Sequence, residues 1–491
     1  MRRARLLGII ATLLMAVAAP AWAERAPDLV LTGEVTHADH QTWREVPFRV
    51  PAGVERLTLS FEHDGAAQKS VIDLGLADPQ RFRGWSGGNK SQVVLAAAEA
   101  TPSYLPGPVV PGRWRLLLGV PNLRPGAVAH YTARIWFDRA GEIALGAPPV
   151  RAGPGWYRGD LHLHTAHSDG SCKSKRGQAV PCPVFLTLEA ARARGLDFVA
   201  ITDHNTVSQT DSLRELAPYY DDLLILPGRE LTTFQGHANV IGTSADFEFR
   251  LGSKAAPDLG RLLARVPEEA IISINHPGAP SGELCMGCGW TAPVDPRIAA
   301  VEVVNGANLA LTHSPEGALS GLPFWTARLD AGALLTGIGG SDNHDPTAGG
   351  LRSVGAPATV VHARELSAAA VLEAIRAGHV FVDVWGSPDG LLEITARAGE
   401  ARAEMGDVLP AAAGQAVEVE AHVAGAPAGA RLVASGPGAE LLAQREVAVA
   451  AGESRTAFSF TANGTSRWLR LDLRGADGRL LLIGNPVYLR P

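Results

Sequence analysis

Residues 159–170 read GDLHLHTAHSDG, so that three histidines and two aspartates fall within one short run. His162 and His164 lie two residues apart, and in an extended segment their side chains project from the same face. Imidazole is a common ligand of zinc, manganese and iron, and Asp169 follows the expected strand end. The pattern predicts part of a metal site, although by itself it also fits half-exposed strand histidines.

The sequence around this stretch, residues 149–388, alternates short apolar runs with helical patterns, as in LTLEAARARG followed by LDFVAITDHN. Such βα repetition predicts a parallel sheet or barrel. Each apolar run ends in polar, metal-competent residues, and barrel enzymes build their active sites at the carboxyl ends of the strands. The residues that follow the runs are Asp203, His204, Glu230, Asn275, His276, Asn305, Asp342 and His344.

Short alternating strands flank this region on both sides. In RLTLSFE the apolar positions are Leu57, Leu59 and Phe61, and in WLRLDLRG leucines alternate with charged residues. We therefore expect a β-sandwich at 24–148 and a second one at 389–491. The fold class predicted for the whole chain is multidomain, α/β in the centre and all-β at both ends.

The first 23 residues, MRRARLLGIIATLLMAVAAPAWA, combine three arginines, an apolar run and a small-x-small ending. This pattern predicts a signal peptide at 1–23, with the mature chain beginning near Glu24. An uncleaved anchor helix is the alternative, but the apolar run is short for a membrane span. We expect a periplasmic or secreted protein with no membrane span after signal removal.

An oxidising compartment makes disulfides the default for the four cysteines, which allow three pairings. We expect Cys172 to pair with Cys182, and Cys285 with Cys288. The CMGC run at 285–288 is also compatible with a redox pair or with half of a zinc site.

The central motifs together resemble the PHP superfamily, the polymerase and histidinol phosphatase metallohydrolases, and within it the CehA/McbA-type metallohydrolases. The resemblance covers about 155–388 and is carried by GDLHLHTAHSDG, FVAITDHNT, PGRELTTFQGHANVIG, INHPG, GIGGSDNHD and LSAAAVLEAIRAGHVFV. It implies a distorted (β/α)₇ barrel at 149–388 that holds two or three divalent ions of zinc, manganese or iron.

Transferred position by position, the resemblance also implies the ligands. One ion would be held by His162, His164, Glu230 and Asp342, a second by Glu230, His237 and His276, and a third by Asp169, His204 and His344. Glu230 would bridge two ions, and Glu230, Asp169 and His344 are the residues expected nearest to the reaction.

Residues beside these ligands have two possible roles. Asp160, Asp203 and Asn343 could orient imidazoles through hydrogen bonds, or could simply cap strand ends. His167 could be a ligand, a proton shuttle or an exposed side chain.

The resemblance implies hydrolysis by a metal-bound hydroxide, because the ions lower the pKa of bound water. The central region, residues 149–388, contains no G-x-S-x-G elbow, which argues against serine catalysis there. A net charge of −6 gives no global basic field, so we expect a small-molecule substrate and no nucleic-acid platform. The sequence leaves the oligomeric state open.

Four cations favour an anionic substrate. Lys173, Lys175 and Arg176 lie in CKSKRG, and Arg352 lies just past His344. A solvated loop and a structural arginine are the alternatives. The expected function is a metal-dependent phosphoesterase acting on monoesters or diesters. The alternatives are a carbamate, ester or amide hydrolase, and a binding protein with a non-catalytic metal-binding barrel.

Overall fold

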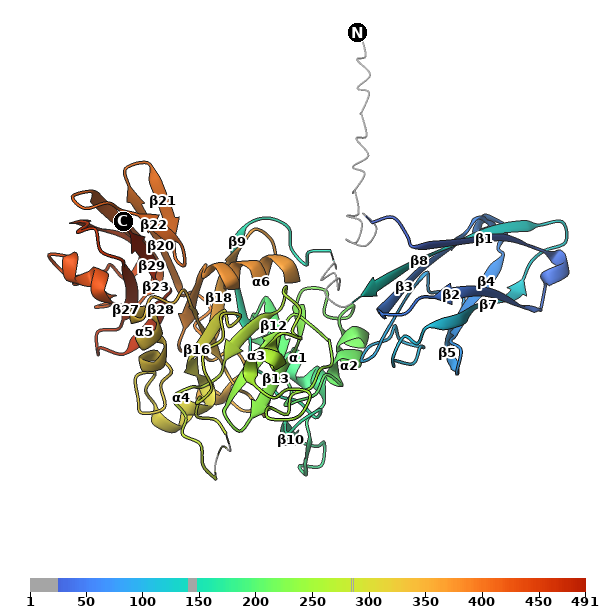
Figure 1. Ribbon diagram of the computed structural model, residues 1–491, viewed down its shortest axis with the longest axis horizontal. Coiled ribbons are helices and arrows are strands. Elements are labelled where there is room, and N and C mark those ends of the chain that lie inside the picture. Colours follow the sequence, from blue (N-terminus) through green and yellow to red (C-terminus); the bar gives the residue numbers. More distant parts are fainter. Residues whose placement is uncertain (1–24, 140–147, 284, 286) are drawn as a thin grey trace, which may run out of the picture.

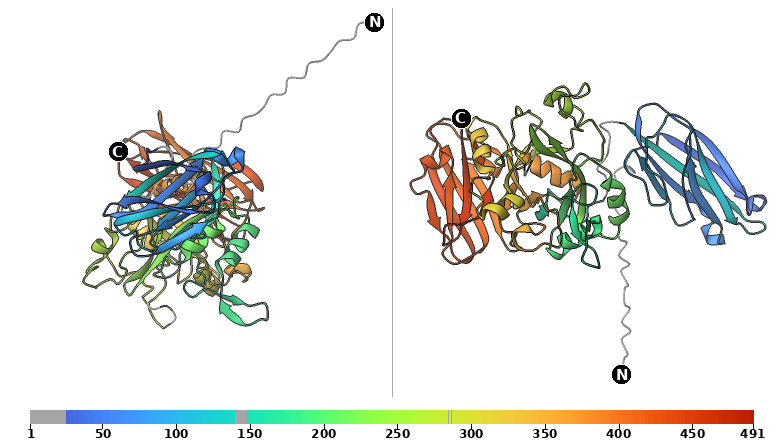
Figure 2. Two further views of the ribbon diagram at one scale, coloured as in Figure 1. Left: turned by 90° about the vertical axis from the view of Figure 1, so that its right-hand side faces the viewer. Right: turned by 90° about the horizontal axis from the view of Figure 1, so that it is seen from below.

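The computed structural model describes residues 25–139, 148–283, 285 and 287–491. The predicted signal peptide lies outside this described part. Three regions follow one another along the long axis, the amino-terminal strands at one end and the carboxyl-terminal strands at the other (Figures 1 and 2). No helix among the described residues has the length and apolar character needed to cross a bilayer.

The amino-terminal region is a sandwich of two four-stranded antiparallel sheets, ordered β1-β8-β3-β6 and β2-β7-β4-β5. The expected alternation is confirmed, since Leu57, Leu59 and Phe61 are buried between the sheets. Its strands are β1 (Leu29–Thr36), β2 (Trp43–Val50), β3 (Val54–His63), β4 (Val71–Ala77), β5 (Phe82–Ser86), β6 (Gln92–Ala96), β7 (Gly112–Asn122) and β8 (Val128–Arg139).

The central region forms one curled sheet, ordered β17-β16-β15-β14-β13-β12-β9-β18-β19. Its strands are β9 (Gly155–Asp160), β12 (Phe198–Ile201), β13 (Leu224–Thr233), β14 (Gly236–Ile241), β15 (Ile271–Ile274), β16 (Ala300–Asn305), β17 (Thr336–Gly340), β18 (Ala358–Ala363) and β19 (Val380–Asp383). A separate hairpin, β10 (Ser171–Lys173) and β11 (Ala179–Pro181), projects below it in Figure 1.

Six α-helices occur in the described residues, all of them in this region: α1 (Val184–Ala193), α2 (Gln209–Leu216), α3 (Leu259–Leu263), α4 (Gly306–Thr312), α5 (Leu322–Asp330) and α6 (Ala368–Ala377). The expected distorted (β/α)₇ barrel is not what the structure shows. Strands β9, β12 and β13 run parallel, as do β15, β16 and β17, but β14 is antiparallel to both its neighbours and β18 is antiparallel to β9 and β19.

The antiparallel direction of β14 has a local cause. Strands β13 and β14 are joined by a tight turn at Phe234 and Gln235, where a crossover helix would be needed to keep them parallel. Side chains join β17, one edge of the curl, to β18 and to the segment after β28 (Leu480–Gly484). Thr359 Oγ1 bonds both the N–H and the carbonyl of Gly339, and the Asn485 amide bonds both backbone groups of Gly337.

The carboxyl-terminal strands do not form an independent sandwich. One sheet, β21-β20-β23-β26, is separate, but β28, β27, β24 and β25 continue the central sheet through the antiparallel pair β19–β28. The strands are β20 (Leu391–Ala398), β21 (Ala401–Glu404), β22 (Val408–Pro410), β23 (Ala416–Ala426), β24 (Arg431–Ser435), β25 (Glu446–Ala448), β26 (Gly452–Thr461), β27 (Arg467–Arg474), β28 (Leu480–Gly484) and β29 (Val487–Arg490).

The alternation of residues in β27 is part of the pattern that predicted a separate β-sandwich. Its leucines enter the carboxyl-terminal core, as expected. The charged residues between them, Arg470 and Asp472, are also buried and form an ion pair of 2.9 Å, with the Arg470 guanidinium lying over the ring of Trp325 in α5. The charged alternate face of β27 therefore contacts the central region.

Both predicted disulfides are present, Cys172–Cys182 and Cys285–Cys288. The first joins β10 to the residue after β11 and closes the hairpin base beside the metal-competent residues. Backbone bonds from Ser171 N–H to His344 O and from Ala166 N–H to Cys182 O fix this base.

We predict that Cys172→Ser combined with Cys182→Ser lowers the free energy of unfolding by up to about 3 kcal/mol, because the open chain regains the entropy of the short loop. Urea-induced unfolding of both proteins measures this. Wild-type protein with both disulfides reduced is the control and should lose at least as much stability as the double variant. An unchanged urea midpoint in the variant would contradict the prediction.

Candidate metal centre

The residues that follow β9 and β17 are joined to each other by their backbones. The Asp342 N–H bonds His162 O at 2.9 Å, and the His164 N–H bonds Asn343 O at 3.0 Å. Asp342 and His276 have positive φ angles of 53° and 29°, which side-chain-bearing residues seldom adopt. Such strain persists where the surrounding structure fixes a functional geometry, so these strand ends are candidates for a site.

Glu230, fully buried in β13, is the centre of this cluster. Its Oε1 lies 3.5 Å from His162 Nε2, 3.3 Å from His237 Nδ1 and 3.3 Å from His276 Nε2, and its Oε2 lies 3.5 Å from His164 Nε2 and 2.8 Å from His204 Nδ1. Asn275 Nδ2 donates to Oε1 at 2.8 Å. One carboxylate thus faces imidazoles from four separate segments of the chain.

The Nε2 atoms of His162 and His164 are buried and have no hydrogen-bond partner. Both face Asp342 Oδ1, at 3.4 and 3.2 Å. Ligand atoms about 2.1 Å from one tetrahedral ion lie about 3.4 Å apart, so these separations fit the edges of a coordination shell. Unpartnered buried nitrogens facing carboxylates are the observation that fits divalent metal ions.

A second group opens toward solvent. Asp169, which is 56% exposed, lies 3.3 Å from His344 Nε2, 3.6 Å from His204 Nε2 and 3.9 Å from His164 Nδ1. His344 and His204 are 37% and 27% exposed. The site therefore grades from fully buried at Glu230 to accessible at Asp169.

Burial and neighbouring charges shift the pKa values of the buried groups in both directions. Burial opposes ionisation of Glu230, but the charge and hydrogen bonds of His162 and neighbouring imidazoles outweigh it and hold the carboxyl pKa well below its usual range. For His164, burial dominates and lowers the pKa. An ionised carboxylate and a neutral imidazole are the forms that bind metal ions, so Glu230 and His164 favour the binding form. Burial lowers the pKa of His162, but the charges of Asp342 and Glu302 outweigh it and raise that pKa well above its usual range, so metal binding at His162 would displace a proton.

Glu302 in β16 belongs to this site, although its position in a strand gave no motif. Its Oε1 lies 3.0 Å from His162 Nδ1, and its Oε2 accepts from the His276 N–H at 2.8 Å and from Asn305 Nδ2 at 3.0 Å. It therefore orients two candidate ligands. The available signal was a lone carboxylate within the apolar run AAVEVVN, since a buried charge requires partners.

Asp160, Asp203 and Asn343, which could have oriented imidazoles, form hydrogen bonds with other groups. Asp160 accepts from the N–H groups of His162, Ser341 and Gly355, and Asp203 accepts from the Thr165 N–H. Their observed role is to fix the loops that carry the ligands. Asn343 Nδ2 similarly donates to the carbonyls of Asp345 and Arg352.

Thr232 contacts a candidate ligand, whereas His167 contacts a residue outside the centre. Thr232, which the sequence did not single out, lies with its Oγ1 2.6 Å from His204 Nδ1. His167 Nδ1 lies 2.8 Å from Ser208 Oγ, on the half-exposed side of the loop. Among the described residues, His167 belongs to none of the groups of side chains that could share a metal ion.

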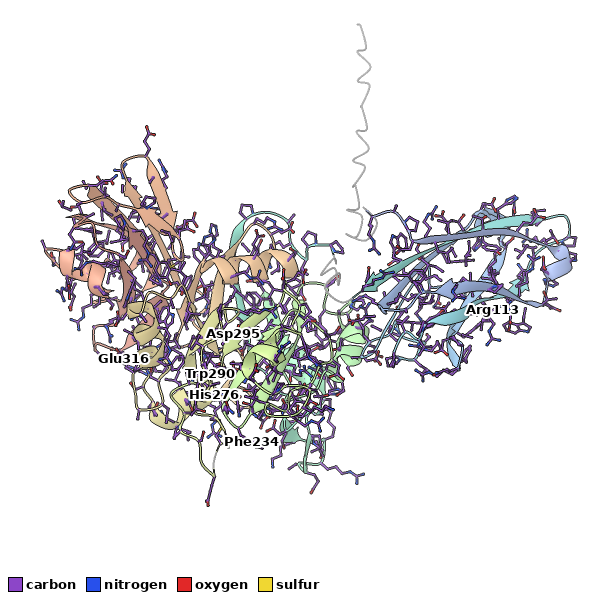
Figure 3. The ribbon with its side chains drawn as sticks, viewed as in Figure 1. Arg113, Phe234, His276, Trp290, Asp295 and Glu316 are labelled. Atoms are coloured by element: carbon purple, nitrogen blue, oxygen red, sulfur yellow. A yellow bond between two sulfur atoms is a disulfide. The ribbon has the colours of Figure 1, made fainter. Side chains whose placement is uncertain are left out.

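The nine predicted ligands are brought together, but their grouping differs from the predicted sets at His162, His164 and His237. Atoms close enough to share an ion form the groups His162, His164, Asp342; His162, Glu230, His276; and His164, Asp169, His204, His344. His237 is near Glu230 but groups with Cys285 and Cys288. In Figure 3, His276 and Trp290 mark this part of the centre and Phe234 lies nearer the lower edge of the molecule.

The basic residues lie in the hairpin and in a nearby turn. Lys173, Lys175 and Arg176 are exposed in the β10–β11 hairpin, whose base is bonded to His344. Arg352 is exposed, and its backbone carbonyl accepts from Asn343. Their contact with a substrate stays a prediction.

Comparisons with known proteins give little support beyond this geometry. No family model matches the chain, and no curated protein matches it. One similar solved structure is a two-domain protein from Bacteroides vulgatus ATCC 8482 containing a predicted PHP-like metal-dependent phosphoesterase. The two chains are 17% identical with a TM-score of 0.35, over 70% of this chain and 97% of that one.

Proposed function

We propose that this protein is a metal-dependent hydrolase, and that it is a phosphoesterase acting on monoesters or diesters outside the cytoplasm. The observation that carries the proposal is the pair of buried, unpartnered Nε2 atoms of His162 and His164, which face Glu230 and Asp342. Two or three divalent ions of zinc, manganese or iron would occupy the centre.

Ions bound there would lower the pKa of a water molecule and stabilise negative charge on the group under attack. Glu230 and Asp342 contribute the buried negative charge that offsets the ions. Glu302 accepts at His162 Nδ1 and so leaves Nε2 of the same ring facing inward. Asp169 and His344 stand at the exposed side, where a substrate can approach.

The exposed side also supports catalysis over a purely structural role. Structural zinc sites are normally closed by four protein ligands, whereas catalytic sites keep an open position. With Asp169 56% exposed, the candidate site is accessible from solvent. The rival proposal, a binding protein with structural metals, would normally have a closed site.

Metal analysis of the purified chain, combined with a screen of nitrophenyl phosphates, phosphodiesters, carboxylic esters and carbamates, tests the proposal. We expect at least two ions per chain and hydrolysis of a phosphate ester that stops on chelation and returns with metal. Turnover of esters or carbamates alone would favour the alternative hydrolase. Bound metal with no turnover of any substrate would favour the binding protein.

The hairpin cations give a sharper test of the phosphate preference. We predict that replacing Lys173, Lys175 and Arg176 by serine raises KM for phosphate esters and leaves neutral esters almost unchanged. Attraction between exposed charges weakens over a Debye length of about 10 Å at 0.1 M salt, so the wild-type preference should shrink as salt increases.

Steady-state kinetics of both proteins at low and high salt measure this effect. Arg113→Ser, a change on the distant amino-terminal sandwich (Figure 3), is the matched control for loss of an exposed cation. The same salt dependence in the triple variant and in wild type would show that the hairpin is a solvated loop with no role in substrate binding.

A further inference from the structure

The Cys285–Cys288 disulfide lies against a candidate ligand of the metal centre. Cys288 is fully buried, and its Sγ is 4.0 Å from Nδ1 of His237. Ligand atoms of His237, Cys285 and Cys288 all lie within 4.8 Å of one another. Two sulfurs and an imidazole nitrogen are a ligand set that zinc prefers.

The loop that carries the cysteines is fitted onto the turn that precedes His237. The N–H groups of Thr291 and Ala292 both bond Gln235 O, at 2.8 and 3.2 Å. Gly287 lies so close to this turn, at a φ of +82°, that a Cβ there would meet the backbone of Thr233 and Phe234. His237 and the cysteines are therefore held next to each other by backbone contacts that do not depend on the disulfide.

The distances suit a tetrahedral ion. With zinc about 2.3 Å from sulfur and about 2.0 Å from nitrogen, neighbouring nitrogen and sulfur ligands lie about 3.5 Å apart. The observed 4.0 Å between Cys288 Sγ and His237 Nδ1 is only slightly longer. A disulfide, however, leaves neither sulfur as a thiolate, which is the form that binds zinc.

We infer that Cys285, Cys288 and His237 form a redox-gated zinc site, closed while the disulfide exists and able to bind Zn²⁺ once the cysteines are reduced. This site goes beyond the proposed hydrolase. It shares His237 with the predicted ligand set of the second ion, but the cysteines have no part in any of the predicted sets.

The redox step needs a dithiol reductant. Its thiolate attacks Sγ of the half-buried Cys285 to form a mixed disulfide and releases Cys288, and its second thiol then displaces Cys285. The reductant leaves as its own disulfide after supplying two electrons and two protons. Zn²⁺ then binds both sulfurs and releases the two thiol protons to solvent.

Reduction would also affect the main centre. His237 Nδ1 lies 3.3 Å from Glu230 Oε1, and this one nitrogen can bind only one ion at a time. An ion held with Cys285 and Cys288 would therefore withdraw His237 from Glu230. This second consequence rests on the proposed function, whereas zinc binding by the cysteines does not.

Cobalt titration of the full chain, after chelation and under inert gas, tests the inference with Co²⁺ as the probe. Dithiol-treated protein, freed of reductant by gel filtration, is expected to show a thiolate-to-cobalt charge-transfer band that oxidised protein lacks. The band should persist in Cys172→Ser/Cys182→Ser, the matched control that removes the other disulfide, and be absent from Cys285→Ser/Cys288→Ser.

A band of equal strength in oxidised protein, no band after reduction, or a band in the Cys285→Ser/Cys288→Ser variant would each overturn the inference. Mass spectrometry of alkylated thiols verifies that the disulfide was reduced before each titration. The band is read without substrate, so a protein that hydrolyses nothing yet shows it would contradict the proposed function and support the zinc site.

Discussion

Glu230→Gln is expected to lower hydrolysis by more than about 100-fold, since loss of a residue that merely orients a ligand already costs 10–100-fold. The glutamine would remove the buried negative charge that faces imidazoles on all sides, from His162 to His276. It would also present amide hydrogens where metal ions require a lone pair. We expect the bound metal to decrease together with the activity.

His237→Asn and His276→Asn are the comparison, because each of these imidazoles faces only one oxygen of Glu230. Each should cost less activity than Glu230→Gln. Metal content by mass spectrometry and kcat/KM on the best phosphate ester are the measurements, with circular dichroism as a control of folding. Near-normal turnover and metal content in Glu230→Gln would show that Glu230 is not the bridging ligand.

Glu302→Gln is expected to raise the metal concentration needed for half-maximal activity by about 10–100-fold. The two carboxylate oxygens of Glu302 face donors on both sides, His162 Nδ1 on one and the His276 N–H with Asn305 Nδ2 on the other. An amide has only one acceptor oxygen. In either orientation its NH₂ group would face a donor, and one candidate ligand would lose its support.

The role of Glu302 is positional, so saturating metal should restore most of kcat in the variant. Glu316→Gln is the matched control, because Glu316 is a half-exposed partner of Arg474 on the surface. It should leave the metal requirement unchanged. An unaltered metal requirement in Glu302→Gln would remove Glu302 from the site, and a loss of kcat that excess metal does not restore would point to a different role.

Local patterns in the sequence predicted where the candidate ligands lie. The two-residue spacing of His162 and His164, and the polar residues after each apolar run, follow from the geometry of single strands. A pattern of this kind is the same whether the neighbouring strand runs parallel or antiparallel. The same applies to the buried leucines of the sandwich strands, and the structure contains both of the disulfides that were expected.

The direction of the strands was not available from such patterns. An apolar run reads the same in a parallel and an antiparallel pair, so the sequence could not show that β14 and β18 run against their neighbours. It could not show that β19 pairs with β28 either. Residues 388 and 389 were taken as a domain boundary, whereas one sheet extends on both sides of it.

The sequence by itself determined which residue types could bind metal and near which strand ends they stand. Only the tertiary structure decided how these residues are grouped. Glu302 meets His162 across 140 positions of the chain, and Cys288 meets His237 across 51. Such contacts depend on the curl of the sheet and on loops packed over turns, and the free energy that fixes them comes from packing between segments that carry no mutual signal in the sequence.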